Sequence, residues 1–65
     1  MGHTTKYKSK LIVRMRRIRG QMAAVERALE EGTVCAEVLQ LVAAARGGMN
    51  GLMAELMDII RRYLK

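Results

Sequence analysis

The side chain in this sequence best suited to chemistry is its single cysteine, Cys35. It follows Gly32 and Thr33, which read as the stop of one helix and the N-cap of the next. Cys35 is therefore expected two residues after the cap, where free backbone N–H groups and the helix dipole favour a thiolate. Such a thiolate is a nucleophile or a soft metal ligand. The alternative is a small buried hydrophobe, as most free cysteines are.

The only histidine, His3, lies in the N-terminal arm beside Gly2. With Met1 retained, Met-Gly-His offers an amine, backbone nitrogens and an imidazole, a set that suits square-planar Ni(II) or Cu(II). Removal of Met1 would spoil that set, and an ordinary solvated or tag-derived histidine is the alternative. His3 and Cys35 alone do not complete a metal site within one chain, so further donors are expected from water, backbone or another subunit.

The basic side chains gather at the start of the chain. Residues 1–20 carry seven of them and no acid, whereas residues 21–65 carry five basic and six acidic side chains, for a net charge of +6. This asymmetry indicates an anionic partner, either nucleic acid or a membrane surface, although a solvated helix face is the simpler alternative. Lys10, Arg14 and Arg17 share one helix face and are the best candidates for phosphate contacts, and Arg46 can reach the same surface from the second helix.

The sequence has no signature of an enzyme. It lacks a Ser/His/Asp set, a phosphate-cradling glycine loop and a CxxC motif. The six acidic residues are spaced like surface charges, and Glu55 near the glycine-rich segment is a candidate partner for Arg46. No aromatic residues are interleaved with the cations to stack bases, and no helix-turn-helix spacing is present.

The apolar pattern predicts an all-α hairpin in a single domain, residues 1–65. Residues 1–5 form a mobile arm, with Thr4 or Thr5 as a cap, and the helices span about 6–31 and about 34–64. Gly20 is expected where another helix comes close. The segment 43–51 reads as a loop or as a continuous helix, and the unbroken phase of the apolar seam favours the helix. The first helix carries a heptad-like stripe: Leu11, Met15, Ile18, Met22, Val25 and Leu29.

The second helix is apolar on two neighbouring faces, more than one hairpin partner can cover. A chain of 65 residues without a disulfide rarely buries enough apolar surface to be stable alone, so we expect a dimeric four-helix bundle and a disc-like tetramer. No apolar run is long enough to span a membrane, and the N-terminus does not resemble a signal peptide. A lone cysteine without export signals is typical of a cytoplasmic protein.

Several short segments together resemble the CsoR/RcnR/FrmR family, bacterial cytosolic repressors that sense metal ions or formaldehyde. They are the run from Arg16 to Gln21, Cys35 near a helix start, Arg46-Gly47, and the run from Asn50 to Glu55. The resemblance implies a homotetramer that binds double-stranded operator DNA through Arg14, Arg17 and Arg46. It also implies an effector site at Cys35, shared between subunits, whose occupation releases the DNA.

The opening Gly2-His3-Thr4 resembles the nickel/cobalt branch, which implies Ni(II) or Co(II) at His3 and Cys35. However, the family's sensory histidines would fall at Ile60 and Leu64, which cannot bind metal. The formaldehyde-type reaction needs only the Cys35 thiolate and an amine, which Gly2 can supply. The other interpretation of the whole chain is a small hairpin dimer that binds RNA or a protein partner without sensing.

Overall fold

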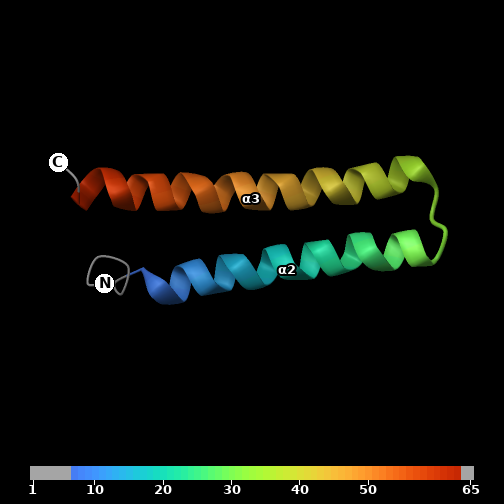
Figure 1. Cartoon of the computed structure of the whole chain (residues 1–65), viewed down its shortest axis with the longest axis horizontal. Coiled ribbons are helices and arrows are strands. Elements are labelled where there is room, and N and C mark those ends of the chain that lie inside the picture. Colours follow the sequence, from blue (N-terminus) through green and yellow to red (C-terminus); the bar gives the residue numbers. More distant parts are fainter. Residues whose placement is uncertain (1–6, 64–65) are drawn as a thin grey trace.

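A computed structural model describes residues 7–63 as two long antiparallel helices joined by a short turn (Figure 1). Helix α2 spans Lys8–Glu30 and helix α3 spans Cys35–Tyr63. The hairpin measures 48 × 18 × 11 Å. The described residues contain no strand, so the predicted all-α hairpin is confirmed. The outer ends of the expected helices, at residues 6 and 64, lie outside the described residues. The arm at residues 1–5, including Thr4 and Thr5, lies outside the described residues, and Tyr7 occupies the N-cap position of α2.

The turn is a Schellman motif centred on Gly32. Gly32 has φ 72°, the left-handed conformation that glycine adopts at low cost. The Thr33 N–H donates to the Ala28 carbonyl at 3.0 Å, and the Gly32 N–H donates to the Leu29 carbonyl at 3.3 Å. The sequence predicts Thr33 as the N-cap of the second helix, but the Thr33 N–H closes α2 instead. Helix α3 therefore begins one residue later than that cap implies. The Val34 carbonyl accepts the first bonds of α3, so Cys35 is its first residue.

Helix α3 continues without a break through the glycine-rich segment, as the phase of its seam predicted. Two of its glycines allow close contact with α2. A Cβ on Gly48 would lie 3.0 Å from Ile18 Cγ1, and a Cβ on Gly51 would collide with the Arg14 guanidinium. The expectation for Gly20 is wrong within the hairpin, because that glycine is exposed and a Cβ there would have nothing within 4 Å.

The core of the hairpin is small, with four buried apolar side chains among the described residues. They are Ile18, Ala28, Ala45 and Ile59. The predicted stripe of α2 is divided: Leu11, Ile18 and Val25 are at least partly buried, whereas Met15, Met22 and Leu29 are exposed. A single antiparallel partner covers only part of the stripe's width, and α3 leans toward the flank that carries Arg14 and Gln21.

The other flank of the hairpin exposes a continuous set of apolar side chains. It includes one of the two apolar faces predicted for the second helix, which carries Leu39, Val42, Met53, Met57 and Ile60. Exposure on this scale is typical of an interaction surface. Neither helix of the described segment has the long apolar stretch that a bilayer crossing requires.

Candidate functional site

Three of the four predicted DNA-contacting residues lie together on one flank of α2. Lys10, Arg14 and Arg17 line an open depression with Ser9 and Val13. They are brought together because they are spaced four and three residues apart, which places them on one helix face. No acidic side chain of the described chain pairs with Arg17. The depression thus presents a row of cations at an open surface.

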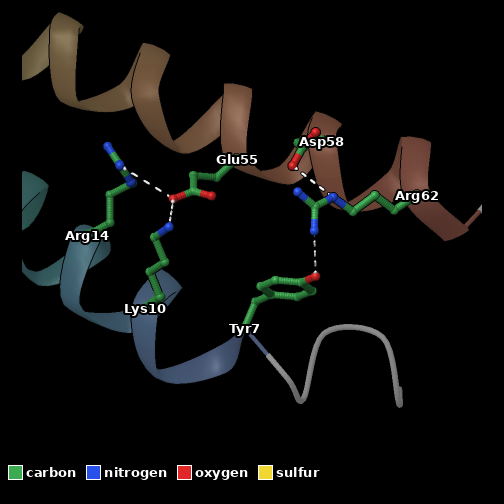
Figure 2. A network of polar contacts seen from close by, with 6 residues as sticks. All are labelled: Tyr7, Lys10, Arg14, Glu55, Asp58 and Arg62. Atoms are coloured by element: carbon green, nitrogen blue, oxygen red, sulfur yellow. Dashed lines mark hydrogen bonds and ion pairs between the residues drawn. The ribbon is translucent and has the colours of Figure 1, made fainter.

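Glu55 of α3 projects between two of these cations (Figure 2). Its Oε1 atom lies 3.1 Å from Lys10 Nζ, and Arg14 Nη2 donates to the same oxygen at 3.5 Å. The hydrogen bond from Lys10 is the main reason why the pKa of the Glu55 carboxyl lies below its ordinary value of 4.5. Partial burial opposes this shift, and the charges of Lys10 and Arg14 add to it. Glu55 is therefore a carboxylate at neutral pH.

Arg14 is held close to α3 rather than extended into solvent. Its side chain is 32% exposed, compared with 66% for Lys10. The guanidinium occupies the space that a side chain on Gly51 would fill, one helical turn before Glu55. The glycine thus lets a long cation reach across the interface to the acid.

Arg46, the fourth candidate, is exposed on α3 but does not line this depression. It precedes Gly51 by five residues, which places it about 140° around the helix from the side that Arg14 contacts. Within one chain Arg46 therefore points away from the row on α2. The structure also pairs Glu55 with Lys10 and Arg14, and not with Arg46.

A second polar contact joins the open end of the hairpin. Arg62 Nη1 donates to the Tyr7 hydroxyl at 3.2 Å, and Arg62 Nε lies 3.2 Å from Asp58 Oδ2 (Figure 2). This contact links the start of α2 to the last turn of α3. It lies beyond Lys10 and fixes the register of the two helices next to the cationic row.

Cys35 is the first residue of α3 and therefore lies at the turn, and it is exposed rather than buried. The turn is at the opposite end of the hairpin from the start of α2 (Figure 1). Cys35 lines an apolar depression that both helices form, on the flank with the exposed apolar side chains. The lining residues are Leu29, Thr33, Cys35, Val38, Leu39 and Val42. No group of three potential metal ligands exists among residues 7–63, so the described part of one chain does not fit a metal ion at Cys35.

Gly2 and His3, the other predicted effector residues, lie outside the described residues. Chain length alone limits what they can reach. Tyr7 and Leu29 are separated by 22 residues of helix, or ~33 Å, and Leu29 lines the same depression as Cys35. The five residues from Gly2 to Tyr7 span at most ~18 Å when fully extended. Gly2 and His3 can therefore meet only the Cys35 of another chain.

Sequence reasoning missed the role of Glu55, which it treated as a surface charge. The signal was present in two spacings. Lys10 and Arg14 are like charges four residues apart, and α2 offers them no acid of its own. On α3, Gly51 precedes Glu55 by four residues, so the acid has a neighbour small enough to admit a long cation.

This chain matches one protein family and is similar to proteins from two bacterial species. A family described as metal-sensitive transcriptional repressors matches residues 7–62. An uncharacterized protein from the bioA 5′ region of Serratia marcescens is 53% identical over 58 residues, which cover 89% of this chain and 64% of that protein. A homologue of the transcriptional repressor RcnR from Escherichia coli O139:H28 is 49% identical over 55 residues, which cover 85% of this chain and 61% of that protein.

The fold of the chain is also similar to that of a solved regulator. The chain is similar to a solved structure of a variant of FrmR, a formaldehyde-responsive regulator from Salmonella enterica serovar Typhimurium. The TM-score is 0.85 and the identity 48%, over 91% of this chain and 67% of the other. The two curated relatives are longer proteins, and this chain spans less than two thirds of the length of each. From the family match and this fold, the chain belongs to the metal-sensitive transcriptional repressors, a family of regulators and not of enzymes.

Proposed function

We propose that this chain is a cytoplasmic repressor that binds double-stranded operator DNA and releases it when an effector acts at Cys35 and the N-terminal arm. The observation that carries the proposal is the depression in which Lys10, Arg14 and Arg17 converge. Three cations in one row match the spaced charges of a phosphate backbone. Arg46 joins them from another chain of a homodimer or homotetramer.

The arrangement of two surfaces on the hairpin supports the proposal, because a cationic surface and an apolar surface lie on different flanks. Lys10, Arg14 and Arg17 line one flank beside the exposed Val13, and the exposed apolar side chains of α3 line the other flank. Chains that pack through their apolar flanks keep the cationic flanks outward, where DNA can reach them. The same packing brings a second chain to the end of the molecule that carries Cys35.

DNA binding is tested by measuring the Kd for duplex DNA over a range of salt concentrations. The affinity should fall steeply with salt, because each neutralised phosphate releases counterions. Arg17→Ala should weaken binding and flatten the slope of log K against log salt by about 0.9 for each phosphate that the variant no longer neutralises. Arg27→Ala is the matched control: Arg27 is exposed on the same helix, ten residues or ~15 Å away from Arg17. Binding insensitive to salt and to Arg17→Ala, or a preference for RNA, would contradict the proposal.

The effector is a metal ion of the Ni(II) or Co(II) type, or formaldehyde. For a metal, Cys35 and His3 would supply donors from two chains. For formaldehyde, the Cys35 sulfur and the N-terminal amine of another chain each form a bond to the carbon. The carbonyl oxygen leaves as water with one proton from the thiol and one from the amine. The product is a methylene bridge that adds ~12 Da.

Intact mass spectrometry with Ni(II), Co(II) or formaldehyde distinguishes these effectors. A retained metal identifies the metal branch, whereas two chains joined covalently, with ~12 Da added for each link at Cys35, identify the formaldehyde branch. Cys35→Ala should abolish the change in mass and the release of DNA while leaving DNA binding itself intact. DNA release that persists in Cys35→Ala would remove Cys35 from the effector site.

A further inference from the structure

Glu55 occupies the place between two cations that a DNA phosphate oxygen would take. A single carboxylate oxygen meets Lys10 Nζ at 3.1 Å and Arg14 Nη2 at 3.5 Å. Phosphate oxygens bind the same side chains through the same charge-assisted hydrogen bonds. A phosphate that takes up these same hydrogen bonds therefore has to displace the Glu55 carboxylate.

Four features distinguish this contact from an incidental surface ion pair. Glu55 is only 20% exposed, so its carboxylate is confined between the helices. It joins α3 to α2, and it shares one oxygen between two like charges that would otherwise repel each other. Gly51 leaves the space through which Arg14 reaches it.

We propose that Glu55 is an internal competitor of DNA, which holds Lys10 and Arg14 until a phosphate displaces it. The inference rests on the proposed DNA-binding function and adds a residue that limits DNA binding. Arg17 lines the same depression without an ion-pair partner among the described residues. It therefore contacts a phosphate without first losing an ion pair. Lys10 and Arg14 must give up Glu55 first.

The exchange makes Glu55 a determinant of specificity. A phosphate placed well enough to contact both Lys10 and Arg14 replaces what Glu55 provides, whereas a loosely placed phosphate does not. Unfavourable competition of this kind weakens every DNA complex, but it weakens poorly fitting ones most. Glu55 thus reduces the binding of duplex DNA of arbitrary sequence, which the positive charge of the chain alone would favour.

The test compares Glu55→Gln with the wild-type chain on duplex DNA of random sequence. Glu55→Gln should lower Kd roughly three- to tenfold at low salt, since an ion pair of modest strength no longer has to be broken. It should also steepen the salt dependence, because the cations become fully available for phosphate. Glu55→Asp keeps the charge but withdraws it by one methylene, and it should give an intermediate Kd.

Glu37→Gln is the matched control, the same substitution on an exposed residue of α3. Glu37 is 18 residues or ~27 Å along the helix from Glu55, well beyond the screening length at ordinary salt. The gain from Glu55→Gln should disappear when Lys10 and Arg14 are both alanine, and it should persist with Arg17→Ala.

The possible outcomes separate the competitor role from the DNA-binding function on which it rests. If the wild-type chain shows no salt-dependent binding to duplex DNA, the proposed function fails and this inference fails with it. If the wild-type chain binds but Glu55→Gln binds no more tightly than Glu37→Gln, only the competitor role is wrong. Weaker binding by Glu55→Gln would make Glu55 a positioning residue that presents the cations to DNA, and would also overturn the proposal. Helicity measured by circular dichroism verifies that each variant is folded.

Discussion

The protonation of Glu55 links the cationic row to the stability of the hairpin. Because the hydrogen bond from Lys10 lowers the pKa of this carboxyl below 4.5, the folded state binds the proton less tightly than the unfolded state does. The contribution of Glu55 to stability is therefore fully present above about pH 4.5 and is lost as the pH falls through the lowered pKa. The same loss frees Lys10 and Arg14 from their counterion.

We predict that the stability of the wild-type chain relative to Glu55→Gln is greatest above about pH 4.5 and declines below it. Urea denaturation at a series of pH values, with the protein concentration fixed, measures the difference. Repeating the series at about 1 M salt should reduce it, because exposed charges are screened. A difference that grows as the pH falls would show that Glu55 is not stabilised as a carboxylate.

At the scale of the helices, some glycines of α3 lie against α2, where a side chain would not fit, and others face open space. A Cβ on Gly48 would meet Gln21 Oε1 at 2.7 Å and Ile18 Cγ1 at 3.0 Å, whereas a Cβ on Gly47 would have nothing within 4 Å. Gln21 is flexible and can move, but Ile18 is 2% exposed and has no space to shift.

We therefore predict opposite effects from two adjacent substitutions. Gly47→Ala should stabilise the chain by up to ~1 kcal/mol, the gain in helix propensity. Gly48→Ala gains the same propensity but overpacks the interface, and it should be less stable than Gly47→Ala by ~1–3 kcal/mol. Thermal or chemical denaturation at equal protein concentration gives the comparison. Equal stability of the two variants would mean that the helices do not cross closely at Gly48.

The sequence was informative where local chemistry decides the structure. Gly32 is the left-handed residue of the turn, as its position predicted. The unbroken phase of the apolar seam correctly predicted that α3 continues as a helix through its glycines. It was less informative where two elements meet. The heptad pattern of α2 does not reveal that Ile18 faces α3 while Met22 faces outward, because both belong to one stripe. Spacing within each helix marks Lys10, Arg14 and Glu55 as candidates for a contact between helices, but their pairing depends on how the two helices are rotated.

At the scale of the whole molecule, the distance between the candidate effector groups is the main constraint. Helix α3 begins with Cys35 at the turn, and α2 begins at the opposite end of the hairpin (Figure 1). A chain that senses through both must therefore do so as an assembly, with the thiol of one copy beside the arm of another. The exposed apolar flank near Cys35 supplies a surface for that assembly.

This constraint predicts the products of a cross-linking experiment. Gly2→Cys places a second thiol in the arm, which spans at most ~18 Å of the ~33 Å that separates Tyr7 from the turn. Mild oxidation should therefore give covalent dimers and larger species on non-reducing gels, with peptide mapping showing residue 2 joined to Cys35 of another chain. In the Cys35→Ala background the same arm thiol can join only to its own copy in another chain, so the 2-to-35 linkage should be absent. A monomer with an internal 2-to-35 disulfide would contradict the hairpin geometry, and the absence of any 2-to-35 linkage would contradict an effector site shared between chains.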